Sequence, residues 1–429
     1  MTSRRNFFKK SIAAAGTLSL APLAAKAMAE DIADALHSLN LLSPTLASTD
    51  EDLWARMAQA YTVSPNILNL NNGGVSPQPK VVQDAVDRYY HYSNEAPSYY
   101  MWQILDKGRE AVRRKLADLG GVSPDTIAIN RNTTEALATV TGGLTLAKGD
   151  EIIMTKQDYP NMIQTWKQKE MRDGIKITWL TIALPTEDGE SIVKAYINAT
   201  TPKTKIWHIT HMINWTGQIM PVKRLCEEAR KRNIISIVDG AHTFAHMDFK
   251  ISDFNPDYYG TSLHKWLCAP FGTGMLYVKK ENVAGLWPLF PNDKPQMDDI
   301  RKFETLGTRS FAPEQAIGQA VDFHNAIGSK RKEERLQYLK NYWCEKVKQH
   351  PRIQLNISLK PEWSCALGSF SMEGIEPDVV SSKLMSGYQI HTTSVKWENI
   401  SGVRITPHVY TTTKDLDRLV EAVLTLAKS

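Results

Sequence analysis

The chain has 429 residues, of which 42% are hydrophobic and 23% charged, and this composition excludes a disordered chain, a coiled coil and a small disulfide-stabilised scaffold. The formal net charge of +5 comes from 51 Lys and Arg against 46 Asp and Glu. Five of the basic residues precede the first acidic residue, Glu30, so the rest of the chain is neutral and we expect no nucleic-acid partner.

The first 29 residues have the pattern of an export signal. The pair Arg4-Arg5 is followed by a weakly apolar stretch over residues 11–25 and by the small-x-small sequence Ala27-Met28-Ala29. This order is typical of a twin-arginine signal, which predicts export of the folded protein to the periplasm by the twin-arginine translocase. The apolar stretch is too short and too rich in Ala to span a bilayer, so we expect no stable membrane anchor. The alternative is a basic helix of the folded domain.

Residues 30–80 are expected to form an N-terminal segment and linker, with a helix over 53–61 and a dense turn cluster over 69–77. Further helices are predicted over 79–92 and 107–118. Short apolar runs then alternate with helix-length segments; the runs lie at 127–129, 151–154, 175–180, 204–209, 234–238 and 275–278, and the helices at 134–146, 159–174 and 222–233. This alternation predicts a large α/β domain over residues 81–300, with a mostly parallel sheet covered by helices on both faces.

The pattern changes near residue 303. Long helices over 313–343 are followed by shorter strands and by a closing helix over 413–427. This change predicts a smaller C-terminal α+β domain over residues 301–429. The four cysteines have no metal-ligand spacing and are too few for a disulfide framework, so we expect no metal site; they are Cys226, Cys268, Cys344 and Cys365.

Three features together predict a site for pyridoxal 5'-phosphate. Asp239 ends an apolar strand, at the edge where open α/β sheets bind ligands. Lys265 lies between an imidazole and an indole residue, a setting that can lower the pKa of an amine and make it a nucleophile. Thr133 and Thr134 open a helix after a strand, where backbone N–H groups can hold a phosphate. Singly, these residues could be helix caps or structural, but the cofactor needs an amine, an acid and a phosphate cradle together.

Six segments in chain order resemble the class V aminotransferases, the fold-type I pyridoxal-phosphate family that includes cysteine desulfurases and isopenicillin-N-epimerase-like enzymes. The segments are residues 71–74, 131–135, 211–217, 238–242, 262–266 and 306–309. The resemblance covers Asn69 to the C-terminus. It implies an α/β fold with a mostly parallel seven-stranded sheet in the large domain and a smaller C-terminal α+β domain.

The resemblance also implies cofactor contacts. Lys265 would form the Schiff base, Asp239 would pair with the ring nitrogen, and Asn214 and His242 would lie near the phenolic oxygen. The phosphate would contact Thr133, Thr134, Ser262 and His264. A stacking side chain is expected in the loop after residue 155, where either Gln157 or Tyr159 could supply it, and the sequence leaves this choice open.

Two further implications concern the partner and the substrate. Gly307 and Thr308 match a Gly-Thr pair that reaches the phosphate of the neighbouring subunit, which implies a homodimer. Arg404 and Asn72 would bind a small-molecule or peptide-like amino substrate that carries a carboxylate. A desulfurase needs a mobile cysteine shortly before that Arg, and residues 388–402 contain none.

Several functions remain after these observations. Transamination, epimerisation, a lyase reaction and oxidative decarboxylation would all begin with transfer of the aldimine from Lys265 to the substrate amine. A twin-arginine signal on such a domain resembles the periplasmic enzymes that tailor the glutamyl side chain of pyoverdine siderophores. A nicotinamide oxidoreductase is disfavoured because Gly272-Thr273-Gly274 lacks a third glycine. A non-catalytic binding protein would have no use for Lys265 and Asp239 together.

Overall fold

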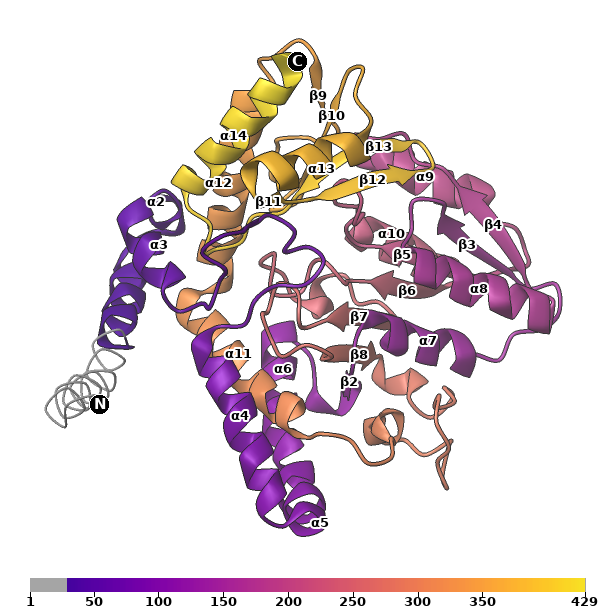
Figure 1. Ribbon diagram of the computed structural model, residues 1–429. Helices are drawn as coiled ribbons and strands as arrows, with labels where there is room; N and C mark the ends of the chain where they lie inside the picture. The colour runs from indigo at the N-terminus through magenta and orange to yellow at the C-terminus, as the bar shows by residue number, and fades with distance from the viewer. Residues whose placement is uncertain (1–28, 429) are drawn as a thin grey trace, which may run out of the picture.

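The computed structural model describes residues 29–428 (Figure 1). Arg4, Arg5 and the rest of the predicted export signal up to residue 28 lie outside the described residues. None of the helices within residues 29–428 is long and apolar enough to cross a membrane.

A seven-stranded sheet forms the centre of the large domain, with the order β2-β8-β7-β6-β5-β3-β4. The strands are β2 (Ile127–Asn130), β3 (Glu151–Thr155), β4 (Lys176–Leu180), β5 (Thr204–Thr210), β6 (Ile235–Asp239), β7 (Tyr258–Ser262) and β8 (Gly274–Val278). All neighbours run parallel except β8, which is antiparallel to both β2 and β7. The predicted fold class, an α/β domain with a mostly parallel sheet, is confirmed.

Strand β7 is buried although its sequence contains no apolar run. It contains Gly260, Thr261 and Ser262 and is nevertheless buried along its whole length. A Cβ atom at Gly260 would lie 2.7 Å from Cδ2 of Leu137, so the glycine lets the helix above it approach the sheet closely. Sheet position, rather than side-chain hydrophobicity, therefore determines the burial of β7.

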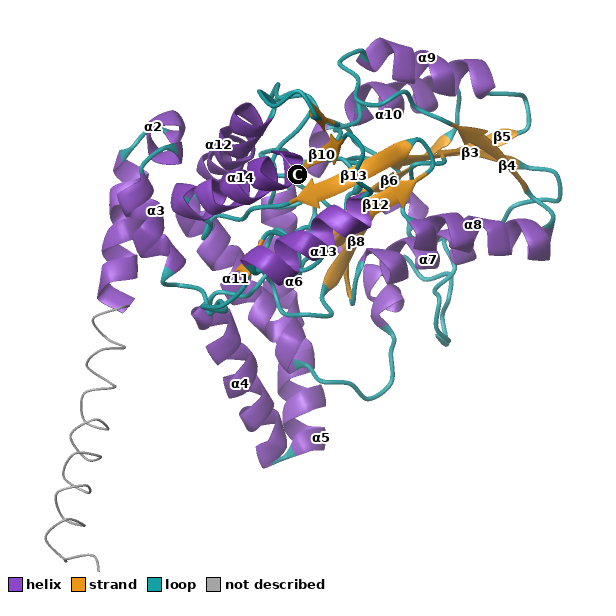
Figure 2. Ribbon diagram, turned by 45° about the horizontal axis from the view of Figure 1, so that its top comes forward, coloured by secondary structure: helices purple, strands orange, loops and turns teal. Residues whose placement is uncertain are grey.

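Helices cover both faces of this sheet (Figure 2). One face carries α7 (Thr133–Gly143) and α8 (Pro160–Asp173), which share a core with Ile152, Ile206 and Ile237. The other face carries α6, α9, α10 and α11, packed against alternate strand residues. Their bounds are α6 (Asp106–Gly120), α9 (Gly189–Ala199), α10 (Val222–Lys231) and α11 (Ala312–Ile327). Because strands buried on both sides are usually rich in apolar residues, most of these strands other than β7 read as hydrophobic runs in the sequence.

The small domain is built on a four-stranded antiparallel sheet with the order β12-β13-β10-β9. Its elements are β9 (Ile353–Leu355), β10 (Gly368–Met372), β12 (Thr393–Trp397), β13 (Ile400–Ile405), α12 (Ser329–Val347), α13 (Pro377–Tyr388) and α14 (Thr413–Lys428). The N-terminal strand β1 (Leu68–Asn69) pairs in parallel with β11 (Ile390–His391) and adds Leu68 and Leu70 to the core of this domain.

The predicted long helical stretch over 313–343 is two helices, because Gly328 has a φ of +90° between α11 and α12. Although α11 lies beyond the predicted domain boundary at residue 301, it packs against α6 and α4 (Lys80–Glu95) of the large domain (Figure 1). Ala316, Ile317 and Val321 belong to the core of the large sheet. Apart from Leu68 and Leu70, the small-domain core thus comes from residues after Gly328.

The remaining elements surround these two cores. The helix over residues 29–41, α2 (Pro44–Ser48) and α3 (Glu51–Ala58) share a hydrophobic cluster with Leu336 of α12, with Trp266 and Cys268, and with Val409. In this cluster the buried Arg335 pairs with Glu51. Short helices complete the chain: α5 (Pro97–Tyr99), η1 (Tyr100–Leu105), η2 (Pro124–Thr126), η3 (Ile251–Asp253), η4 (Lys280–Asn282) and η5 (Ile300–Glu304).

Candidate active site

A cavity of about 470 Å³ opens at the carboxyl ends of the parallel strands, between the two domains. This is the edge at which α/β sheets bind ligands. Three parts of the chain contribute to its wall: the loop after β1, the ends of the sheet strands with the loops that follow them, and the small domain. Its lining includes Asn71, Gly73, Thr133, Thr134, Tyr159, Thr210, Asn214, Trp215, Asp239, His242, Ser262, His264, Lys265 and Arg404.

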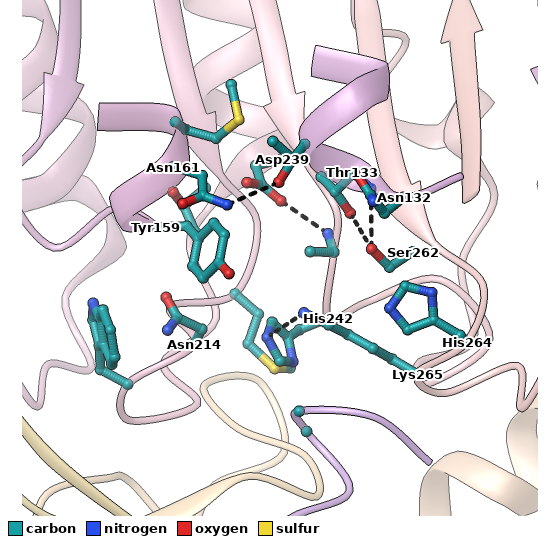
Figure 3. A pocket seen from close by; sticks show the side chains of 18 of the residues that line it. Asn132, Thr133, Tyr159, Asn161, Asn214, Asp239, His242, Ser262, His264 and Lys265 are labelled. Carbon is teal, nitrogen blue, oxygen red and sulfur yellow. Dashed lines mark hydrogen bonds between the residues drawn. The ribbon is translucent and has the colours of Figure 1, made fainter. Parts of the chain in front are cut away.

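Lys265 provides the amine of this cavity. Its Nζ atom lies 3.0 Å from Nε2 of His242 (Figure 3). Desolvation lowers the pKa of Lys265 to about 8, with the charge of Asp239 opposing the shift and that of Arg404 adding to it. Burial, with Lys265 as a further cause, holds the pKa of His242 well below its usual range. The neutral imidazole can therefore accept a hydrogen bond from the lysine and orient it.

Asp239 provides the acid. It ends β6, is 4% exposed, and accepts a hydrogen bond of 3.0 Å from the N–H of Ala241. Burial raises its pKa to about 6, and the charge of Asp158 adds to this shift, while the Ala241 N–H and the charges of His208 and Lys265 oppose it. A carboxylate with raised proton affinity is a strong acceptor for a protonated ring nitrogen.

The start of α7 forms the expected phosphate cradle. The N–H of Thr133 donates to Oγ of Ser262 over 3.0 Å, and the two hydroxyl oxygens are 2.7 Å apart (Figure 3). Asn132 caps the helix by accepting a hydrogen bond from the N–H of Glu135. Thr134 and His264 also line the cavity. Backbone N–H groups and the dipole of an eleven-residue helix thus face an opening that suits an anion.

Buried polar atoms around the cavity have no partner within the described chain. They are Oγ1 of Thr210, Oδ1 of Asn214, Nδ1 of His242 and Nε of Arg404. Since buried polar groups are normally hydrogen-bonded, these atoms fit a site that is completed by a polar ligand. Together with the lysine, the acid and the cradle, they fit pyridoxal phosphate.

Of the two candidates for stacking, only Tyr159 lines the cavity, and its side chain is 40% exposed. Gln157 is fully buried elsewhere. Its amide donates to the carbonyl oxygen of Ile182 and to Oδ1 of Asn399, and its oxygen accepts from the N–H of Ile182. Gln157 is therefore a structural residue, and its assignment to the cofactor site is wrong.

Asn72 also lies outside the cavity. Its side chain bonds to the carbonyl oxygen of Thr406 over 2.8 Å and accepts from the hydroxyl of Tyr410 over 2.6 Å. The neighbouring Asn71 lines the cavity instead and accepts a hydrogen bond of 2.8 Å from Nη2 of Arg404. The predicted position of Asn72 in the cavity is thus wrong, because the turn that begins at Asn71 directs the Asn72 side chain to Thr406 and Tyr410.

Arg404 projects from β13 and is 6% exposed. Its Nη1 donates to the backbone oxygen of Asn214 over 2.8 Å, while Nε remains without a partner. Burial lowers its pKa to about 10. The guanidinium is therefore oriented by Asn71 and Asn214 and keeps donor capacity for an anionic ligand.

Gly307 and Thr308 do not reach this cavity within one chain. Thr308 lines a separate cavity of about 370 Å³ beside α4, together with Tyr90 and Arg309. The resemblance assigns the Gly-Thr pair to the site of a neighbouring subunit, so its role, like the homodimer, stays a prediction.

Some lining residues were absent from the sequence predictions. Thr210 ends β5 in the way that Asp239 ends β6, and the two are direct neighbours in the sheet. The position of Thr210 at the end of a predicted strand could therefore have identified it as a cavity residue. Trp215, in the loop after β5, and Asn161, in the first turn of α8, also line the cavity, but their sequences carry no comparable signal.

The model of the class-V aminotransferase family matches residues 68–419. The chain belongs to the class-V aminotransferase family. Its cofactor is accordingly pyridoxal phosphate, which the residues of the cavity fit.

Two curated relatives illustrate the range of this family. An isopenicillin N epimerase from Amycolatopsis lactamdurans is 27% identical over 394 residues, which cover 87% of the chain and 99% of the relative. A probable cysteine desulfurase from Halalkalibacterium halodurans is 26% identical over 86% of the chain and 95% of its own length. Among solved structures, the cysteine desulfurase CsdA from Escherichia coli has a TM-score of 0.77 at 22% identity, covering 87% of the chain and 98% of that protein. This class-V aminotransferase therefore has relatives with different reactions on one fold.

Proposed function

We propose that this class-V enzyme acts on the amino group of a carboxylate-bearing, peptide-like compound in the periplasm, with the glutamyl side chain of a pyoverdine-type siderophore as substrate. The observation that carries the proposal is that Arg404 and Lys265 line one cavity, so a carboxylate and an amine can be held at the same time. The bound cofactor supplies a conjugated ring that takes up the electron pair released when a bond to the substrate Cα breaks.

Lys265 captures the cofactor and moves a proton. Its lowered pKa leaves more of the amine unprotonated near neutral pH, as a nucleophile needs. Once a substrate amine has displaced it, the same Nζ atom is free to act as a general base at the substrate Cα. His242 orients this amine in the 3.0 Å contact.

Arg404 selects the carboxylate. Its planar guanidinium can bind a carboxylate through two parallel hydrogen bonds, and the buried setting strengthens such a pair. The contacts to Asn71 and Asn214 fix its orientation before the substrate arrives. A substrate without a carboxylate would leave the buried donor unpaired, which costs affinity.

Desulfuration is disfavoured by the cysteines. All four are free and buried, and within residues 29–428 no cysteine lines the cavity. Burial raises the pKa of Cys268 to about 11 and that of Cys344 to about 12, so neither is a ready thiolate.

The hairpin of β12 and β13 is also fixed in place. Nε1 of Trp397 donates to the backbone oxygen of Lys156 over 2.8 Å, and its ring stacks on Trp215 with the centroids 5.4 Å apart. Asn399 is bonded to Gln157 and to the backbone oxygen of Ile182. A desulfurase would need a mobile cysteine in this segment. Here these contacts hold the segment against the large domain.

Epimerisation is the second candidate reaction. It is favoured by the relatives named isopenicillin N epimerase, which are 27% identical and match nearly their whole length. It would use the same displacement of Lys265 by the substrate amine and the same carboxylate contact at Arg404, and it would return the proton to the opposite side of Cα.

The proposal is tested by offering the holoenzyme three amines: a peptide with an exposed glutamyl α-amino group and carboxylate, its carboxamide analogue, and L-cysteine. We expect a change of the visible spectrum with the first, at least about tenfold weaker binding of the carboxamide, and no sulfide from cysteine. Arg404→Lys should raise KM for the glutamyl peptide by a similar factor, whereas the exposed Arg224→Lys serves as a matched control without effect. Equal affinity for the peptide and its carboxamide, or robust sulfide release, would contradict the proposal.

A further inference from the structure

A buried group of three titratable side chains lies behind the cavity. Asp158, His208 and Asp239 come from the loop after β3, from β5 and from the end of β6, three neighbouring strands. One ligand atom of each lies within 4.8 Å of the others. Asp158 and His208 are 0% exposed, and neither lines the cavity, so a substrate cannot touch them.

The proton on His208 is directed by Trp166. Nε1 of this tryptophan, on α8, donates to Nδ1 of His208 over 3.3 Å. Nδ1 must therefore be an acceptor, and the imidazole carries its proton on Nε2, which lies 3.6 Å from Oδ1 of Asp158. A second proton on Nδ1 would face the indole N–H and is disfavoured.

Asp158 has little else to compensate its charge. Its Oδ1 accepts a hydrogen bond from the N–H of Tyr159 over 2.9 Å, and its Oδ2 has no partner. Besides His208, the titratable groups near Asp158 are Asp239 and the hydroxyl of Tyr196 on α9. Lys265 lies beyond Asp239. With His208 kept neutral by Trp166, the negative charge of Asp158 acts on Asp239 within this buried group.

We propose that Asp158, with His208 held neutral by Trp166, is a positioning group that strengthens the hold of Asp239 on the proton of the cofactor's ring nitrogen. This inference rests on the assignment of Asp239 to that nitrogen. A second negative charge within 4.8 Å favours the protonated ring, because like charges in a buried site raise each other's proton affinity.

The neighbouring carboxylates act against this neutral state of His208, so the contact with Trp166 has to oppose them. Burial lowers the pKa of His208, but the carboxylates of Asp158 and Asp239 outweigh this and raise it. Without the indole N–H of Trp166, His208 would take up a second proton more readily and cancel the charge of Asp158. Loss of Trp166 should therefore mimic loss of Asp158.

The test uses holoenzyme reconstituted with pyridoxal phosphate labelled with ¹⁵N in the ring, whose chemical shift reports ring protonation as pH is varied. In Asp158→Asn we expect the midpoint of deprotonation to fall by at least about one pH unit, which is a tenfold loss of proton affinity. Trp166→Phe should shift it in the same direction by less. Tyr196→Phe is the matched control, because it removes only a hydrogen bond to the backbone oxygen of His208 and should titrate like the wild type.

The variant Asp239→Asn distinguishes the role of Asp158 from the contact of Asp239 with the ring nitrogen. If it lowers the midpoint while Asp158→Asn and Trp166→Phe do not, the inference about Asp158 is wrong and the role of Asp239 stands. If Asp239→Asn has no effect either, the assignment of Asp239 itself fails. Should Asp158→Asn not fold, Trp166→Phe against Tyr196→Phe still decides, since only the former alters the charge of the cluster.

Discussion

Gly274 leaves no room for a side chain beside Asn132: a Cβ atom at this position would lie 2.6 Å from the backbone nitrogen of Asn132. Gly274 begins β8, and Asn132 caps the helix α7 that forms the phosphate cradle. The close approach of these two backbones therefore sets where the start of α7 lies relative to the sheet.

Gly274→Ala should push the start of α7 away and weaken cofactor binding by about tenfold or more, as overpacking against a backbone costs 1 to 3 kcal/mol. Equilibrium titration of apoenzyme with pyridoxal phosphate measures this. Gly285→Ala is the control, because nothing lies within 4 Å of its added Cβ. If both variants bound pyridoxal phosphate with equal affinity, the close contact between residue 274 and Asn132 would not control cofactor binding.

Lys265→Ala should abolish the visible chromophore that borohydride bleaches, while the protein remains folded. Lys265 is the lysine that lines the cavity, beside His242. Absorbance before and after borohydride, with circular dichroism as the check on folding, gives the result. Retention of the bleachable chromophore in the variant would assign the covalent bond to another lysine.

The capture of cofactor by apoenzyme should depend on pH through Lys265. Because the free amine is the nucleophile and its pKa is lowered from 10.5 to about 8, the rate should rise as pH increases through about 8 and then level off. Stopped-flow measurements of apoenzyme with pyridoxal phosphate test this. A rate that rises steadily toward pH 10 would mean that the amine is not desolvated.

Glu304→Gln should destabilise the large domain. Glu304 and Arg113 form an ion pair with each side chain 1% exposed, and Oε1 of Glu304 also accepts from the N–H of Ile129 in β2. Removing one partner leaves a buried charge, so the free energy of unfolding should fall by about 3 to 5 kcal/mol. Urea unfolding measures it, and Glu376→Gln, from the exposed pair with Lys396, should change stability by less than about 0.5 kcal/mol.

Replacing Arg4 and Arg5 with Lys should leave folded holoenzyme in the cytoplasm, because the arginine pair is the expected recognition element of the translocase. Cell fractionation followed by cofactor absorbance in each fraction tests this. A variant that is still fully periplasmic would show that the pair is only a generic basic segment.

Much of the chemistry was predictable from short segments of sequence. Lys265, Asp239 and the threonines at the start of α7 are set by local pattern, because a strand end or a helix start fixes where its residues lie. The apolar runs likewise predicted most strands of the large sheet, since strands covered on both faces are usually rich in apolar residues.

The sequence by itself predicted the fold class, the family and most of the candidate residues that line the cavity. Only the tertiary structure showed that Tyr159 and Asn71, rather than Gln157 and Asn72, line the cavity, and that Asp158 and His208 lie behind Asp239. The physical reason is that a loop residue faces the cavity or the core according to contacts made by distant segments. Asn399 of the small domain, for example, binds the amide of Gln157, 242 residues away in the chain. No periodicity in the sequence records such a contact.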